Sequence, residues 1–331
     1  MLQHRLMSVA AAAEVISSGA ACCVAGDEAM LRRLPRGCWV GGTIPYFMSE
    51  RGGTCSHDKV FVSTLPGEPS RMRIVRHSRS TLPGICTEAP EHGYTLLLMP
   101  AFSPVLQSFA EEAPTYDEMY LRPLFGWVSG VHLDELGKRA PLVFNGQSGE
   151  AYEDAALALH AELPPTTTMH IDIVNPFQKQ TGPVIELDRG GFFADVCRVD
   201  GRAENLHDFL LNINHDIRLP LVADYCGALV NVSIRQLHAK TRQVEFYTPV
   251  FSGVSYQTAA PVSDYVAAFS TALATHRMPG EMVFACNCAL NHVYGELDGR
   301  QLEIHGPATF GEIAYLLLNQ TLIHVSLVDR E

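Results

Sequence analysis

Short apolar runs, separated by turn residues, recur along the chain and predict many strands and few helices. The clearest is Tyr94–Met99, a continuous apolar segment closed by Pro100, which is typical of a strand buried on both faces. Further strands are predicted at Ala20–Ala25, Cys38–Met48, Lys59–Leu65, Leu142–Asn145, Met169–Val174, Ala228–Leu237, Gln243–Tyr247, Gly253–Gln257, Met282–Cys288, Phe310–Tyr315 and Leu322–Val328.

Helix-forming composition or spacing appears in fewer segments. Helices are predicted at Ser8–Ser17, Glu28–Leu34, Phe102–Glu112, Ala151–Leu163, Ala203–Asn212 and from a Ser263-Asp264 cap to Leu273. The segment Gly182–Val199 predicts a hairpin around Asp188-Arg189-Gly190-Gly191. A polar stretch at 212–216 then interrupts the apolar pattern. We therefore expect an α+β fold of two domains, 1–205 and 206–331, with mixed β-sheets flanked by helices.

Composition narrows the class of protein. The chain has 331 residues, 47% of them hydrophobic, and a formal net charge of -12, which excludes global disorder. The acidic balance argues against nucleic acid or an anionic membrane surface as the main partner, because both draw on clustered positive charge. No run approaches the roughly 18–20 apolar residues of a membrane span. Glu14 interrupts the Ala-rich segment near the N-terminus, which favours a short helix over a secretory signal.

The cysteines argue against a disulfide framework. They are nine, an odd number, and no C-x-x-C pair occurs among them. This spacing also argues against a four-cysteine zinc site or a thioredoxin-type redox motif. We expect a reducing, cytoplasmic location.

Common catalytic motifs are missing from the sequence. It contains no phosphate-binding P-loop, no G-x-G-x-x-G and no H-E-x-x-H. Gly146-Gln-Ser148-Gly149 lacks the spacing of a nucleophile elbow, and His160-Ala-Glu162 lacks the cysteine half of a deaminase motif. Ordinary NTPases, dinucleotide dehydrogenases, zincins and hydrolases are therefore disfavoured.

Three features remain as candidate chemistry. Gly41-Gly42-Thr43 with Tyr46 offers either free backbone N–H groups for a ligand or a structural tight turn. The Arg71–Arg79 segment is either an anion site or an exposed strand with a solvated face. His292 lies close in sequence to Cys286 and Cys288 and is a candidate haem ligand, with a hydrogen-bonded structural role as the alternative.

The C-terminal part carries a recognisable order of elements. Val283-Phe-Ala-Cys286-Asn-Cys288 is followed by Gly306-Pro-Ala-Thr-Phe310-Gly311-Glu312-Ile313-Ala314 and then by Leu318-Asn319-Gln320-Thr321. This order resembles the last domain of the FIST family of bacterial and eukaryotic sensory proteins. Val40-Gly41-Gly42-Thr43 resembles a segment of the FIST N-terminal domain, and Ser233-Ile234-Arg235 resembles the start of the C-terminal domain. The resemblance thus assigns a FIST N-like domain to 1–205 and a FIST C-like domain to 206–331.

The resemblance implies a non-enzymatic, cytoplasmic, ligand-binding protein of bacterial signal transduction. Its ligand would be an amino acid or a similar small polar metabolite. The residues that it implies for the ligand site are Gly41, Gly42, Thr43, Tyr46, Arg235, Cys286, Asn287, Gly311, Glu312, Asn319 and Thr321.

The sequence also departs from the family pattern. No basic residue follows Cys286 closely, and the aromatic pair before Gly311 is reduced to Phe310. The output modules often attached to FIST domains do not fit in this length, so we expect a separate signalling protein. The alternatives are a haem-binding gas sensor with His292 as axial ligand, an enzyme that uses Cys286 or a His/Asp pair on a small substrate, and an interaction scaffold. The oligomeric state stays open.

Overall fold

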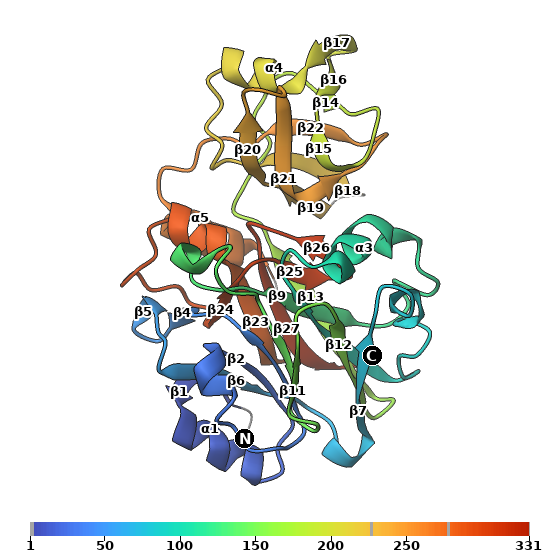
Figure 1. Cartoon of the computed structure of the whole chain (residues 1–331), viewed down its shortest axis with the longest axis vertical. Helices are drawn as coiled ribbons and strands as arrows, with labels where there is room; N and C mark the ends of the chain where they lie inside the picture. Colours follow the sequence, from blue (N-terminus) through green and yellow to red (C-terminus); the bar gives the residue numbers. More distant parts are fainter. Residues whose placement is uncertain (1–2, 226–227, 277–278, 331) are drawn as a thin grey trace.

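Strands provide most of the secondary structure. The computed structural model describes residues 3–225, 228–276 and 279–330, whose strands form five sheets (Figure 1). Three of these sheets are mixed, because each contains a parallel pair: β2 with β3, β8 with β9, and β23 with β24. Helices are few and cover sheet faces. The expected α+β class, with mixed sheets flanked by helices, is confirmed.

The first sheet is built mainly from the N-terminal part of the chain. Its strand order is β1 (His4–Ser8), β6 (Lys59–Thr64), β2 (Cys22–Gly26), β3 (Trp39–Thr43), β10 (Val143–Asn145) and β11 (Glu150–Tyr152). One face is covered by α1 (Val9–Ser17) and α2 (Glu28–Leu31). Helix α1 begins at Ser8 because the Ser8 hydroxyl accepts a hydrogen bond from the Ala11 N–H. Its apolar side, including Ile16, packs against Val24 and Val62 of the sheet.

The second sheet lies in the middle of the structure. Its order is β26 (Leu316–Leu318), β25 (Glu312–Ala314), β9 (Leu124–Ser129), β8 (Gly93–Pro100), β12 (Ala156–Glu162) and β7 (Met72–His77). Helix α3 (Pro104–Glu112) covers one face, where Phe109 packs among Leu97 and Met99. Short 3-10 helices occur at η1 (Pro69–Arg71), η2 (Leu82–Gly84), η3 (Ala113–Thr115) and η4 (Leu133–Glu135).

The third sheet combines both ends of the chain. Its order is β13 (Thr167–Val174), β27 (Leu322–Asp329), β23 (Glu281–Cys288), β24 (Gly306–Thr309), β4 (Tyr46–Ser49) and β5 (Gly52–Cys55). Helix α5 (Tyr265–Thr275) covers one face through Phe269 and Leu273, and α6 (Ala289–Tyr294) follows β23 directly. The remaining faces of the three sheets share one core, which includes Phe61, Trp127 and Phe284. We call these three sheets with their helices the body.

Residues 185–258 form a separate lobe, which Figure 1 shows above the body. One lobe sheet has the order β17 (Arg202–Asn205), β16 (Val196–Val199), β14 (Ile185–Glu186), β22 (Ser255–Thr258), β18 (Leu221–Tyr225) and β19 (Ala228–Val232). The other has the order β15 (Gly191–Ala194), β21 (Gln243–Val250) and β20 (Ile234–His238). With α4 (Leu206–Asn212), these strands enclose their own core, centred on Phe246 and Tyr256.

Strand pairing crosses the boundary expected between residues 205 and 206. β13 precedes the lobe and pairs with β27, at the end of the chain. β4 and β9 of the N-terminal half likewise pair with β24 and β25. The chain therefore leaves the body, forms the lobe and returns, because the apolar strands after the lobe complete sheets that the earlier strands began.

The helix expected at Ala151–Leu163 is wrong. The segment forms β11 and β12 instead, and β12 lies between β7 and β8. Its Ala and Leu residues alternate, so that Ala156 and Ala158 face the core under α3 while Leu157 and Leu159 face the common core. The alternation of Ala and Leu therefore outweighed the helix-forming composition, and the segment became a strand that is buried on both faces.

Three further expectations need correction. The segment Gly182–Val199 does contain an antiparallel strand pair, β14 with β16, but the expected turn at 188–191 does not join them, because its residues lead into β15 of the other lobe sheet. The helix expected from Ala203 begins at Leu206, because residues 202–205 form β17 and the Asn205 side chain caps α4. The strand expected over Ala228–Leu237 is interrupted and forms β19 and β20. Helix α6 is not among the helices that the sequence predicts.

The other expected helices are confirmed as α1, α2, α3 and α5, the last with Asp264 as its N-cap. The Arg71–Arg79 segment contains the edge strand β7, with Arg73 and Arg76 exposed, as expected for a solvated strand.

Eight cysteines lie in the described residues and all are free thiols, whereas Cys226 lies outside them. Within the described ranges, no helix has both the length and the apolar character needed to cross a membrane.

Gly42 allows the first two sheets to approach. A Cβ atom at this position would lie 2.7 Å from Cη2 of the fully buried Trp127. We therefore expect Gly42→Ala to lower the free energy of unfolding by about 1–3 kcal/mol, because the indole has no room to move. Chemical denaturation measures this change. Gly182→Ala is the matched control, since a Cβ there meets nothing within 4 Å, and it should change stability by less than about 0.5 kcal/mol. Equal effects of the two substitutions would contradict this account.

Candidate functional site

A cleft of about 360 Å³ opens between the lobe and the body, a volume typical of small-molecule sites. The body contributes the segment before and within α3, part of the loop at η4, and α6. The lobe contributes residues of β15, β20 and β21. The lining residues are Ala101, Phe102, Ser103, Leu106, Gln107, Leu133, Leu136, Phe192, Phe193, Arg235, Glu245, Phe246, Tyr247, Cys288, Ala289, Leu290, Val293, Tyr294, Thr309 and Phe310.

The walls of the cleft are largely apolar and partly open to solvent. Phe102 of the body and Phe193 of the lobe are each 52% exposed, and Leu133, Leu136 and Val293 are also exposed. Large apolar side chains that gather around a concave surface mark a binding site more often than scattered ones do. The cleft can therefore cover an apolar group of a ligand.

One ion pair provides charged groups within this apolar surface. Arg235 Nη1 donates to Glu245 Oε1 at 2.8 Å, and Arg235 also lies over the Phe102 ring, with Cζ 5.2 Å from the centroid. His238 Nε2 lies 2.8 Å from the other oxygen of Glu245. A guanidinium and a carboxylate side by side can bind the two opposite charges of a zwitterion.

The floor of the cleft leads to a buried carboxyl group. Cys288 and Thr309 line the floor, and the fully buried Glu312 lies behind them, close enough to the Cys288 thiol to raise the pKa of that thiol. Glu312 Oε2 accepts hydrogen bonds from Thr321 N at 3.2 Å and Thr321 Oγ1 at 2.7 Å, while Oε1 has no partner. Burial raises the pKa of Glu312 to about 8. The carboxyl group is therefore largely protonated at neutral pH.

Other polar residues connect this region to the lobe. The Asn319 side-chain oxygen accepts from the backbone N–H and the hydroxyl of Ser233, at 3.3 and 2.9 Å. Asn287 accepts from its neighbour Cys288 and from Asn291. These buried contacts connect the floor of the cleft to the strand that carries Arg235.

Several of the ligand-site residues that the resemblance to the FIST family implied are therefore close together in space. Cys286, Asn287, Glu312, Asn319 and Thr321 lie behind the floor of the cleft and are all buried, whereas Arg235 lines the cleft itself. Gly311 precedes β25, and its carbonyl accepts from Val128 N and Thr309 Oγ1, which is a structural role.

The expected glycine site is not part of the cleft. Gly41, Gly42 and Thr43 are the last three residues of β3, as expected, but the neighbouring strands β2 and β10 pair with them on both sides. Thr43 is tied to Leu142 through its hydroxyl. Tyr46 is buried in β4, where its hydroxyl accepts from Leu133 N–H at 3.0 Å. The glycines serve close packing of the sheets, so the expectation of free N–H groups is wrong.

His292 does not have the surroundings of a haem ligand. Its imidazole is buried between Tyr46 and Gly53, outside the cleft lining, and its Nε2 lies 3.2 Å from Asp298 Oδ1. A haem iron requires a ring nitrogen that faces an open cavity. Neither nitrogen of His292 does so.

The sequence did not indicate that the lobe residues Phe193 and Glu245 belong to a binding site, because no local motif distinguishes them. It also missed Cys55, His57 and His132, whose side chains lie together at another edge of the body. The spacing Cys55-Ser-His57 was a local signal for part of this group.

A second hollow, of about 770 Å³, lies between α5 and β13. It is larger, but small residues such as Ala268 and Ala272 line much of it, and none of the predicted site residues does. Its charged residue Asp264 is already used to cap α5 and to bind Arg300. The cleft between lobe and body is therefore the stronger candidate.

The buried Glu312 predicts a pH dependence of stability. Its pKa is about 8 in the folded protein and near 4.5 when unfolded, so the folded state holds the proton more tightly. Stability should fall as the pH rises from about 4.5 to about 8, because only the folded state then carries this proton. The loss is at most on the order of 5 kcal/mol, since a tenfold change in proton affinity is about 1.4 kcal/mol. Denaturation of the wild type and Glu312→Gln at several pH values measures it. The free energy of unfolding of Glu312→Gln should rise relative to that of the wild type as the pH increases through this window. A difference that does not change with pH would contradict the raised pKa.

The thiols near Glu312 should be unreactive. Burial raises the pKa of Cys286 and Cys288 well above its usual value, and the nearby Glu312 raises it further. A thiol in such surroundings is a poor nucleophile. We expect iodoacetamide to label the exposed Cys55 in the native protein while Cys286 and Cys288 react only after unfolding, as peptide mass spectrometry would show. Rapid native labelling of Cys286 would instead restore the catalytic-cysteine alternative.

Comparison with known proteins gives one match. No curated protein and no solved structure matches the chain. One family model, described as a family of unknown function (DUF6976), matches residues 7–328 and so covers the body as well as the lobe. The chain belongs to this family.

Proposed function

We propose that this protein is a cytoplasmic, small-molecule-binding sensory protein of FIST type, and that its ligand binds in the cleft between lobe and body. The ligand class is an amino acid with an apolar side chain. The observation that carries the proposal is the Arg235–Glu245 ion pair within an apolar cleft.

The charges and the walls of the cleft suit this ligand together. The α-carboxylate would bind Arg235 and the α-ammonium would bind Glu245, so each group meets its opposite charge. Glu245 keeps its second oxygen for His238, which holds the carboxylate in place. The aromatic walls, among them Phe102 and Phe310, would then cover the apolar side chain.

Binding in this cleft would affect the contact between lobe and body. The lobe provides Arg235 and Glu245, whereas the body provides Phe102 and α6. A ligand that contacts both parts favours the arrangement in which both reach it. We propose that a separate signalling protein reads this arrangement.

Thermal unfolding in the presence of amino acids and other small acids tests the proposal. A ligand at 100 times its Kd stabilises the folded state by about 2.7 kcal/mol, which should raise Tm by several degrees. We expect apolar amino acids to produce this shift and small acids without an amino group to produce a smaller one. No shift with any carboxylate ligand would contradict the proposal.

Two variants locate the ligand. Arg235→Ala should weaken binding at least tenfold, because it removes the partner of the ligand carboxylate. Arg198→Ala is the matched control, since Arg198 also lies in the lobe and pairs with a carboxylate, that of Asp188, but does not line the cleft. Calorimetric titration of both variants measures the affinities, and the unliganded Tm of each reports its folding. Equal affinity in the two variants would place the ligand elsewhere.

A further inference from the structure

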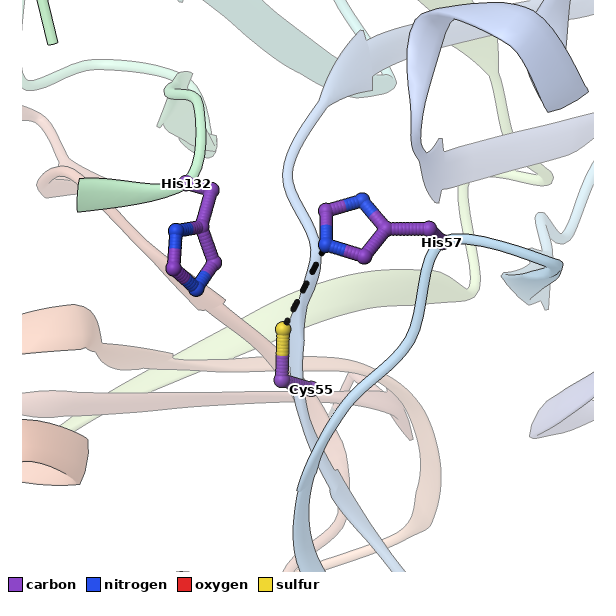
Figure 2. Close-up of side chains that lie close together, drawn as sticks. All are labelled: Cys55, His57 and His132. Carbon is purple, nitrogen blue, oxygen red and sulfur yellow. Dashed lines mark hydrogen bonds between the residues drawn. The ribbon is translucent and has the colours of Figure 1, made fainter. Parts of the chain in front are cut away.

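Three side chains with strong metal-ligating groups meet at one edge of the body, away from the Arg235–Glu245 pair. Cys55 ends β5, His57 lies in the loop that follows, and His132 immediately precedes η4. Their ligand atoms all lie within 4.8 Å of one another, and Cys55 Sγ is 3.9 Å from His57 Nε2. Figure 2 shows the two imidazole rings on either side of the thiol.

These distances are close to those of a zinc site. Zn–S and Zn–N bonds of about 2.3 and 2.0–2.1 Å in a tetrahedral site place neighbouring ligand atoms roughly 3.3–3.7 Å apart. The three donors would need to move by about 1 Å or less to reach that geometry. Cysteine and histidine are also the side chains that zinc prefers.

The surroundings orient His57 for this role. Its Nδ1 lies 3.0 Å from Asp27 Oδ2, which leaves Nε2 directed at the thiol. Asp27 is itself fixed, because it caps α2 and binds Arg139. A carboxylate that holds the far nitrogen of an imidazole is the usual outer partner of a metal-bound histidine.

His132 is also held in position. Its ring stacks on Tyr46 at a centroid distance of 5.4 Å, and the Tyr46 hydroxyl accepts the N–H of the next residue, Leu133. His132 Nδ1 accepts from Asp134 N–H at 3.2 Å and lies 3.6 Å from an Asp134 carboxylate oxygen. When the other ring nitrogen binds a metal ion, the ring proton must sit on Nδ1, so the bond from the Asp134 N–H opens and the Asp134 carboxylate is the acceptor within reach.

A second group of potential ligands is less suited to a cation. His77, Glu88 and His160 also lie close together, and both histidines are buried. Arg73, however, is the cross-strand partner of His160, and its guanidinium donates to the Glu88 carbonyl. This fixed positive charge opposes a metal ion. Near Cys55, His57 and His132 the carboxylates of Asp27 and Asp134 are present, and the one neighbouring cation named above, Arg139, is paired with Asp27, Glu28 and Glu135.

We propose that Cys55, His57 and His132 bind a divalent cation of the zinc class. Three protein ligands at a partly exposed position leave a fourth position for water or for a donor atom of a bound molecule. This proposal does not rest on the ligand proposed for the cleft.

Cobalt(II) tests the site directly, since it takes zinc positions and reports a bound thiolate through its near-ultraviolet charge-transfer absorption. Reduced protein treated with a chelator and then titrated with Co²⁺ should bind one equivalent with this absorption, and Zn²⁺ should displace it. Cys55→Ser should abolish the charge-transfer band, and His132→Asn should weaken Co²⁺ binding at least tenfold. Asp27→Asn, which changes only the outer partner of His57, should weaken binding about 10–100-fold.

The controls separate the remaining outcomes. Cys38→Ser removes another partly exposed thiol and should leave the band intact, and so should Arg235→Ala. His77→Asn tests the second group. Loss of binding in that variant, persistence of the band in Cys55→Ser, or no stoichiometric Co²⁺ binding by the wild type would each overturn the proposal. A failure of amino-acid binding with intact Co²⁺ binding would overturn only the function proposed for the cleft.

Discussion

The antiparallel pairing of β13 with β27 joins the two parts of the chain that flank the lobe. Its register runs from Thr167 opposite Asp329 to Val174 opposite Leu322, along the whole of both strands. β27 also pairs with β23, so the last strand holds β13 and β23 in one sheet. Because β13 leads into the lobe and β23 follows it, this pairing fixes where the lobe leaves and rejoins the body. The cleft between them depends on it.

The buried polar residues near the start of β27 are costly, and their position suggests why they are tolerated. Glu312 Oε1 and the side-chain nitrogens of Asn287 and Asn319 are buried without partners. Each such group costs about 1–3 kcal/mol relative to a satisfied one. Their neighbours contact the lobe through Ser233 and the cleft through Cys288. A buried polar network that connects two parts of a protein gives up stability and, in return, defines how the two parts are arranged.

The two proposed sites share one loop. His132 lies in the cluster with Cys55, whereas Leu133 and Leu136, which follow it, line the cleft. Tyr46 supports both sides of this loop, since its ring stacks on His132 and its hydroxyl accepts the Leu133 N–H. A cation bound by His132 would therefore restrict the same segment that forms part of the wall of the cleft.

The sequence by itself determined the α+β class and most of the strands and helices. Apolar runs such as Tyr94–Met99 and caps such as Ser8 and Asp264 are local signals, and local signals suffice for local structure. At Ala151–Leu163, where composition predicted a helix, burial on both faces of a sheet favoured a strand instead.

The motif order near the C-terminus also brought together residues that are close in space, from Cys286 to Thr321. It did not separate those that line the cleft from those that lie behind its floor, because accessibility depends on neighbours from other segments. Arg235 meets Glu245 and Phe102, and Cys55 meets His132, only after strands from distant parts of the chain have paired. Tertiary structure alone decided these groupings, since the chemistry of each site comes from distances between side chains that no spacing along the sequence records.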